Sequence, residues 1–308
     1  MRNKFVETIV KFAETDSNLF LITGDVGFGV LTDFRNQFPD RFINAGISEQ
    51  NMTSVAAGMA MEGKTVFTYS IANFPTARCF EQIRNDVAYH KANVKIVAVG
   101  GGFSYGAQGM SHHATEDMAI MRALPEMTVF APCDSVETEA VTKYAVGMVG
   151  PVYIRLGRGG EKNLHEGGVD VSIDVLKANV LKNGRDTAIF VAGAIANEAL
   201  DAAVKLELQG VSCAVYSFPS VKPIDSATIL EVAAKVDYIF TLEEHNIVGG
   251  FGSAVSEMIA ESAVKAVVVR MGLNDVYTSA VGSQDYLRAV YGIDANSIFS
   301  RVYEKIRN

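Results

Sequence analysis

Short runs of β-branched and other apolar residues alternate with longer stretches in which apolar residues recur at helical spacing. In the first half of the chain, the short runs predict strands over 19–23, 41–44, 65–69, 94–99, 128–130 and 152–156. The longer stretches predict helices over 48–61, 74–90, 116–123 and 135–146. Strands that alternate with helices indicate a parallel sheet with helices on both faces.

The alternation stops after residue 156 and resumes near residue 187. The residues between are rich in glycine and charge, which is typical of a linker. Beyond it, strands are predicted over 187–191, 211–217, 238–242 and 266–270, and helices over 198–208, 226–234 and 252–260. The predicted fold class is therefore α/β, with two three-layer domains and mostly parallel sheets. Their predicted bounds are 1–160 and 186–308, with a linker at 161–185.

Composition narrows the possible partners. A 49% hydrophobic share of 308 residues is enough for two cores, and the net charge of -8 without a basic stripe argues against nucleic acid. No apolar run approaches the roughly 20 residues that span a bilayer, and the N-terminal pattern lacks the apolar core of a signal peptide, so we expect no membrane span and a cytoplasmic location. The three widely spaced cysteines predict buried thiols, with neither a disulfide framework nor a zinc site, and no metal ligand is assigned.

One carboxylate stands at a predicted helix start. The segment Gly46-Ile47-Ser48-Glu49-Gln50-Asn51-Met52 follows the strand at 41–44. Gly46 permits a turn, Ser48 can cap the helix, and Glu49 enters its first turn. The helix macrodipole favours an acidic residue there in any protein, so position alone does not assign chemistry to Glu49.

A glycine-rich loop follows the strand at 94–99 and ends in two histidines, His112 and His113. Open α/β sheets bind ligands beyond the carboxyl ends of their strands, where this loop emerges, and glycines permit close backbone approach. The adjacent histidines suit a metal in principle, but no cysteine or histidine nearby is spaced to complete a site. Solvated loop histidines are the alternative interpretation.

Together these segments resemble the pyrimidine-binding domain of thiamine-diphosphate enzymes of the transketolase family. A Gly-(Ile/Val)-x-Glu-(Gln/Phe) segment in that family supplies the glutamate that hydrogen-bonds the aminopyrimidine ring, and Glu49 stands at that position. Ser111-His112 matches the family's Gly-x-Thr-His motif, whose histidine contacts substrate hydroxyls near the reacting carbon. The resemblance implies that Phe74 packs on the pyrimidine. The cofactor residues it implies are Glu49, Phe74, Ile71, Tyr69 and Arg78.

The chain departs from the family pattern at several positions. The family usually has further aromatic residues where this chain has Ile71 and Ala77. A phosphate-contacting histidine and an aspartate of the family are replaced here by Gly100 and Gln108, whereas Arg158 matches an arginine that often binds a sugar phosphate. The implied substrate residues are His112, Gln108, Arg158 and Gly100. Whether the substrates are phosphorylated stays open.

The family's Gly-Asp-Gly…Asn motif, which holds magnesium and the cofactor diphosphate, is not matched by Gly24-Asp25-Val26 and Asn51. Residues 221–225 and 243–253 resemble the family's C-terminal domain, which implies architecture rather than catalysis. The resemblance thus implies the C-terminal subunit of a split transketolase. A separate chain would hold the diphosphate and Mg²⁺, with two copies of each chain, and this chain would pair with itself when that partner is missing.

The implied reaction moves a two-carbon ketol unit from a ketose or ketose phosphate to an aldose. The enzyme alternatives are the beta subunit of a 2-oxo acid dehydrogenase and a deoxyxylulose-phosphate-synthase-like enzyme. A further alternative is a non-catalytic subunit that kept the fold. The Ser-Glu-Gln sequence and Ser111-His112 favour a transketolase. A nicotinamide dehydrogenase fits less well, because Thr32 stands where Gly-x-Gly-x-x-Gly requires its third glycine.

Overall fold

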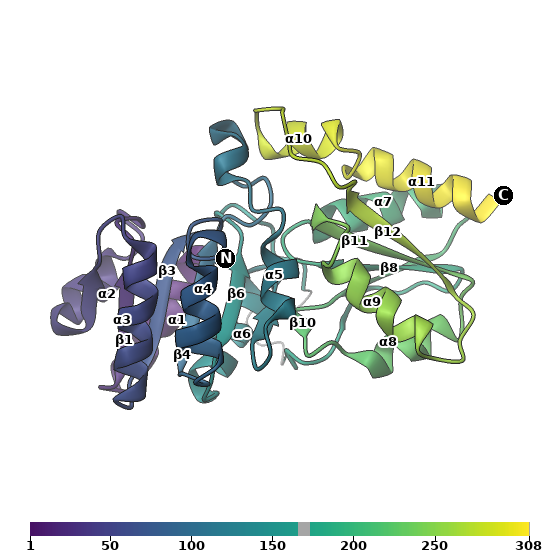
Figure 1. Cartoon of the computed structure of the whole chain (residues 1–308). Helices are drawn as coiled ribbons and strands as arrows, with labels where there is room; N and C mark the ends of the chain where they lie inside the picture. The colour runs from purple at the N-terminus through teal and green to yellow at the C-terminus, as the bar shows by residue number, and fades with distance from the viewer. Residues whose placement is uncertain (166–172, 308) are drawn as a thin grey trace.

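The computed structural model describes residues 1–165 and 173–307 and contains two sheets, each flanked by helices (Figure 1). The first has seven strands in the order β10-β5-β6-β4-β3-β1-β2. Their bounds are β1 (Leu19–Thr23), β2 (Phe42–Asn44), β3 (Thr65–Ile71), β4 (Val94–Val99), β5 (Thr128–Phe130), β6 (Val152–Leu156) and β10 (Ser220–Lys222). All pairs are parallel except β10 with β5. The central strand β4 is buried along its whole length, as a doubly covered sheet requires.

The helices of this half are α1 (Arg2–Ala13), α2 (Thr32–Gln37), α3 (Glu49–Met61), α4 (Phe80–Gln82), α5 (Asp117–Ala123) and α6 (Ser135–Gly147). Three of them, α3, α5 and α6, follow the predicted positions, whereas α1 and α2 were not predicted. The prediction of one helix over 74–90 is wrong. Turns follow Phe74, then a 3₁₀ segment, α4 and a π-helical segment at Ile83–Ala88. The Thr76 hydroxyl donates to the Ala72 carbonyl at 2.7 Å and so stabilises turns in place of a first helical turn.

The second sheet has the order β12-β11-β8-β9-β7. Its elements are β7 (Asn179–Lys182), β8 (Thr187–Ala192), α7 (Ala196–Leu208), β9 (Cys213–Ser217), α8 (Ser226–Ala233), β11 (Tyr238–Asn246), α9 (Phe251–Ala260), β12 (Val267–Leu273), α10 (Gln284–Val290) and α11 (Ala295–Arg307). Strand β7 lies in the stretch predicted as linker and pairs antiparallel with β9, so that part of the stretch belongs to the second sheet. Within the described residues, no helix is both long and apolar enough to cross a membrane.

Strand β10 joins the two halves, because it is the edge strand of the first sheet on the side of the second sheet, with α5 beside it (Figure 1). After β9 the chain returns to the first sheet, where Ser220 pairs with Phe130 of β5. The backbone N–H of Ala131 donates to the Pro219 carbonyl at 2.8 Å, and that of Gly193 donates to the Ala131 carbonyl at 2.9 Å. The halves therefore share backbone hydrogen bonds rather than side-chain contacts alone.

A buried ionic cluster near the start of α6 adds a second connection. Asp134 caps α6 by accepting from the Glu137 N–H at 2.9 Å, and its other oxygen accepts from Nδ1 of His165 at 2.9 Å. Glu137 accepts from Asn179 and from Ser217 of the second half, each at 3.0 Å. Burial opposes a charge on His165, but the hydrogen bond to Asp134 and the attraction of the nearby Glu137 carboxylate outweigh it and raise the pKa of His165 to about 9.

This shift predicts a pH-dependent stability. Because folding raises the pKa of His165 from 6.5 to about 9, its charge stabilises the fold fully below pH 6.5, and this contribution is lost as the pH rises towards 9. In metal-free buffer, we expect His165→Gln to lower the free energy of unfolding by roughly 1–3 kcal/mol at pH 6 and much less above pH 9. Urea denaturation across this range measures it.

His90→Gln is the matched control, since His90 is exposed and lacks a carboxylate partner among the described residues. Its unfolding curves should follow the wild type at every pH. If the His165 variant and the wild type keep a constant difference from pH 6 to about 10, the charge of His165 does not stabilise the fold.

Candidate active site

The candidate site lies at the carboxyl edge of the first sheet, where the loops after β1, β3, β4 and β6 emerge. Ligands of parallel α/β sheets bind at this edge. The loop after β3 is tied to the loop after β4, because the Asn73 side chain donates to the Ser111 carbonyl at 2.9 Å. The predicted residues on these two loops therefore come together, although they are far apart in sequence.

Glu49 is the buried acid of this edge. It is the first residue of α3 and only 1% exposed. Ser48 is the N-cap residue, but its hydroxyl donates to the Ala45 carbonyl at 2.6 Å instead of capping the helix. The Oε2 atom of Glu49 accepts from Arg78 at 2.8 Å, and the Arg78 side chain is 46% exposed. Among the described residues, this arginine is the only hydrogen-bond partner of the Glu49 carboxylate.

Gly24 permits Glu49 and Ser70 to pack closely against the backbone after β1. A Cβ atom on Gly24 would lie only 3.2 Å from Cγ and 3.6 Å from Oε1 of Glu49, and 3.4 Å from the Ser70 hydroxyl. That hydroxyl is buried and has no hydrogen-bond partner among the described residues. The second carboxylate oxygen of Glu49 and an unpaired hydroxyl thus lie next to the same glycine, and neither is hydrogen-bonded within the described part of the chain.

Phe74 and His112 continue the cluster outward from Arg78. The Arg78 guanidinium lies 4.8 Å from the centre of the Phe74 ring, within cation–π range. The His112 ring meets Phe74 edge-on, with centroids 5.1 Å apart. The structure thus brings together four predicted residues in the order Glu49, Arg78, Phe74 and His112.

The two adjacent histidines have different environments. His112 is half-buried, and burial followed by the neighbouring charge of His113 lowers the pKa of its imidazole. His113 is buried, with Nε2 3.1 Å from the Gly106 carbonyl and Nδ1 2.6 Å from the Thr278 hydroxyl. Since a carbonyl only accepts, Nε2 of His113 carries a proton, and this residue connects the loop to the second half.

Arg158 and Gly100 form a neighbouring cluster with Tyr105, which the sequence analysis missed. Gly100 has a φ of +83°, and a Cβ there would overlap the Tyr105 ring. Tyr105 therefore fills the space that a side chain at position 100 would need. The Arg158 guanidinium lies 5.0 Å from the centre of this ring. In the sequence, the only sign that Tyr105 belongs to this cluster is Gly100, whose missing side chain leaves space for the Tyr105 ring.

Three other predicted site residues, Tyr69, Ile71 and Gln108, have different surroundings from these clusters. Tyr69 is 2% exposed and stacks on Phe5 of α1 with centroids 6.2 Å apart, and burial raises the pKa of its phenol. Because alternate side chains of a strand face opposite sides, Ser70 points towards Glu49 and Tyr69 away from it. Ile71 is half-buried at the end of β3, and Gln108 is exposed. No described contact joins Tyr69 or Gln108 to Glu49.

Arg2 is a further cation that sequence reasoning missed. Arg2 is the first residue of α1, and its side chain lies beside Gly159: a Cβ atom built on Gly159 would be 3.8 Å from Nε of Arg2. That Nε is buried and has no hydrogen-bond partner among the described residues. Arg2 and Arg158, from opposite ends of the first half, thus flank the turn after β6. Sequence spacing carries no signal for such a contact.

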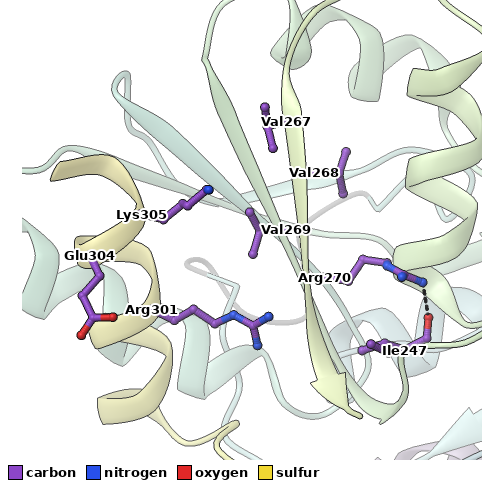
Figure 2. Close-up of a pocket in the computed structure, with 8 residues that line it drawn as sticks. All are labelled: Ile247, Val267, Val268, Val269, Arg270, Arg301, Glu304 and Lys305. Atoms are coloured by element: carbon purple, nitrogen blue, oxygen red, sulfur yellow. Dashed lines mark hydrogen bonds between the residues drawn. The ribbon is translucent and has the colours of Figure 1, made fainter. Parts of the chain in front are cut away.

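A separate open groove of about 600 Å³ lies between β12 and α11 in the second half (Figure 2). Arg301 and Lys305 of α11 face β12 there, and Arg270 donates to the Ile247 carbonyl at 2.7 Å. None of the predicted site residues lines it.

Comparison with known proteins identifies both halves. Residues 1–160 match the family described as "Transketolase, pyrimidine binding domain". Residues 176–298 match "Transketolase, C-terminal domain". These matches confirm the predicted fold class and the resemblance to the transketolase family.

Three relatives have the same extent as this chain. A putative transketolase C-terminal section from Methanocaldococcus jannaschii is 38% identical over 308 residues, which are 100% of this chain and 96% of the relative. One of the subunits of an apulose-4-phosphate transketolase from Phocaeicola vulgatus is 34% identical over 307 residues, 99% of this chain and 97% of the relative. A solved structure described as "Split gene transketolase, inactive beta4 tetramer" is 37% identical, with a TM-score of 0.91 over 99% of this chain and 98% of that one. The chain therefore belongs to the transketolase family of thiamine-diphosphate enzymes and is similar over its whole length to the C-terminal subunits of split transketolases.

Proposed function

We propose that this chain is the part of a split transketolase that binds the pyrimidine end of thiamine diphosphate. With a separate subunit, it would transfer a two-carbon ketol unit from a ketose phosphate to an aldose. The observation that carries this proposal is the buried Glu49 carboxylate, which has a single described partner and stands in line with Arg78, Phe74 and His112. The two relatives named above that match over their whole length are transketolases by name, which favours this reaction over the 2-oxo acid dehydrogenase alternative.

The residues at the edge fit the pyrimidine end of the cofactor. Arg78 donates to one oxygen of Glu49, and the other has no described hydrogen-bond partner and lies near Gly24 and Ser70. A carboxylate oxygen suits the ring nitrogens and amino group of an aminopyrimidine, and the half-buried Phe74 suits its flat face. Thiamine diphosphate, when bound, supplies the nucleophilic carbon that cleaves and re-forms the carbon–carbon bond next to a ketose carbonyl.

This chain's residues would hold and orient the reacting groups. Glu49 would hold a proton-bearing ring nitrogen, with Arg78 fixing the position of its carboxylate. His112, with its lowered pKa, is neutral near pH 7 and can both donate to and accept from a substrate hydroxyl. The loop that carries His112 would cover the reacting carbon.

A separate chain would hold the diphosphate and Mg²⁺. Asp25, the one acid of the Gly24-Asp25-Val26 turn, accepts from the Asn44 side chain at 2.9 Å, and its backbone N–H donates to Asn44. These bonds build a turn and leave Asp25 poorly suited to a metal. Relatives named as a C-terminal section and as one subunit of a transketolase support a partner, and one solved relative is described as an inactive tetramer of beta chains. We propose two copies of each chain in the active assembly and self-association of this chain alone.

We also propose phosphorylated substrates. Arg2 and Arg158 flank one turn at the carboxyl edge, and the buried Nε of Arg2 is unpaired among the described residues. Two arginines suit a phosphate because each presents a rigid fork of donors. One relative is named for apulose-4-phosphate, which supports the same class.

The first prediction concerns Glu49. Ketol transfer should require both this chain and the diphosphate-binding chain, and Glu49→Gln should lower kcat by at least about 100-fold, because the amide cannot hold the pyrimidine proton in the same way. A coupled assay of aldose release from ketose phosphates, with thiamine diphosphate and Mg²⁺, measures it.

Glu62→Gln, the same change at the other end of α3, is the control, since the Glu62 side chain is exposed and makes no described hydrogen bond. It should retain most of the activity. Activity of this chain alone would refute the need for a partner, and no activity in any mixture would favour the non-catalytic alternative.

The second prediction concerns the phosphate. Arg158→Ala and Arg2→Ala should each raise KM for a phosphorylated ketose by about 10- to 100-fold, the value of a charged hydrogen bond. KM for the unphosphorylated ketose should change little. Arg301→Ala, at the remote groove of Figure 2, is the control and should leave both constants unchanged. Equal effects on the two ketoses would argue against phosphate binding.

The third prediction concerns His112 and needs no activity. An NMR titration should place its pKa below the ordinary value of 6.5, since burial and the charge of His113 both lower it. His113→Asn removes one of these causes, so the pKa of His112 should rise yet stay below 6.5. The exposed His90 serves as the internal reference. A wild-type pKa at or above 6.5 would contradict the environment described for His112.

A further inference from the structure

A cluster of metal-ligand side chains lies between the two halves of the chain, away from the candidate active site. One ligand atom each of Cys133, Glu137 and His165 lies within 4.8 Å of the others. Cys133 and Glu137 are buried, and the His165 side chain is 6% exposed. Cys133 lies in the loop before α6 and Glu137 in the first turn of α6, whereas His165 comes from the segment after β6.

His165 presents a free nitrogen to this cluster. Its Nδ1 atom bonds the Asp134 carboxylate at 2.9 Å. Its Nε2 atom is buried, lies 3.4 Å from Oε1 of Glu137, and has no hydrogen-bond partner among residues 1–165 and 173–307. A histidine that bonds a carboxylate through one nitrogen and aims the other at further ligands has the arrangement typical of metal-binding histidines.

We propose that Cys133, Glu137 and His165 form a structural Zn²⁺ site that fastens the segment after β6 to the junction of the two halves. Zinc accepts sulfur, nitrogen and carboxylate ligands together, whereas magnesium prefers oxygen alone. Ligand atoms of a tetrahedral zinc site lie roughly 3–4 Å apart, so small side-chain rotations would close the cluster. Glu137 also accepts from Asn179 and Ser217, so a bound ion would fix contacts to the second half.

The test uses the full chain stripped of metal, without thiamine diphosphate or a partner. Equilibrium dialysis with Zn²⁺ followed by elemental analysis should give one ion per chain, which excess Mg²⁺ does not displace. Co²⁺ in place of Zn²⁺ should give a thiolate-to-metal absorption band. Zn²⁺ should also raise the melting temperature, and its affinity should fall as the pH is lowered, because protons compete for the ligands.

Cys133→Ser and His165→Gln should abolish stoichiometric binding, the absorption band and the rise in melting temperature. Cys213→Ser, which alters another buried thiol, should retain all three. Circular dichroism would show whether each variant is folded. If His165→Gln is not folded, the conservative Cys133→Ser variant tests the site by itself. No stoichiometric binding by the wild type, or binding that survives both ligand substitutions, would overturn the proposal.

Discussion

The placement of the glycine-rich loop after β4 depends on one buried cation, Arg155 near the end of β6. It donates to the Asp117 carboxylate at 2.8 Å, to the Ala114 carbonyl at 2.8 Å and to the Glu244 carbonyl at 3.0 Å. A buried charge is tolerated only when it is paired and hydrogen-bonded, so the loop before Ala114 and the strand β11 must both reach Arg155. Close contacts around Arg155 also explain why residues 100, 101 and 102 are all glycine. A Cβ would meet Tyr105 from Gly100, Arg155 from Gly101 and Glu244 from Gly102, each within 2.6 Å.

Much of the fold was predictable because the central strands are buried on both faces. Their apolar runs end where burial ends, so β1, β4, β5 and β6 match the predicted residues at both ends. The strands β7 and β10 were missed because both are short and take their stability from distant partners. β10, with three residues, becomes a strand only because the chain crosses back to β5, and no local pattern records that pairing.

The candidate site was predictable where the residues lie on consecutive loops of one sheet edge. Glu49, Phe74 and His112 each follow a predicted strand, and the carboxyl ends of parallel strands bring them together. Tyr69 shows the limit of that reasoning, since the two faces of β3 differ and Ser70, not Tyr69, faces Glu49. Arg2 and the cluster at His165 were not predictable for another reason. Their neighbours come from distant segments whose spacing in sequence carries no signal.

Buried carboxylates of the described residues differ in how fully they are hydrogen-bonded. Glu137, Asp134 and Glu244, at the junction of the halves, each accept several hydrogen bonds, so their charges are satisfied within the chain. Glu49 has one partner, and that partner is an arginine that is nearly half exposed. An incompletely paired buried carboxylate raises the free energy of the unliganded protein, and a ligand that donates to its free oxygen offsets that cost. Glu49 thus keeps a carboxylate oxygen available at the edge where a nitrogen-bearing ring is proposed to bind, and the hydrogen-bonded carboxylates at the junction of the halves help to hold that edge in place.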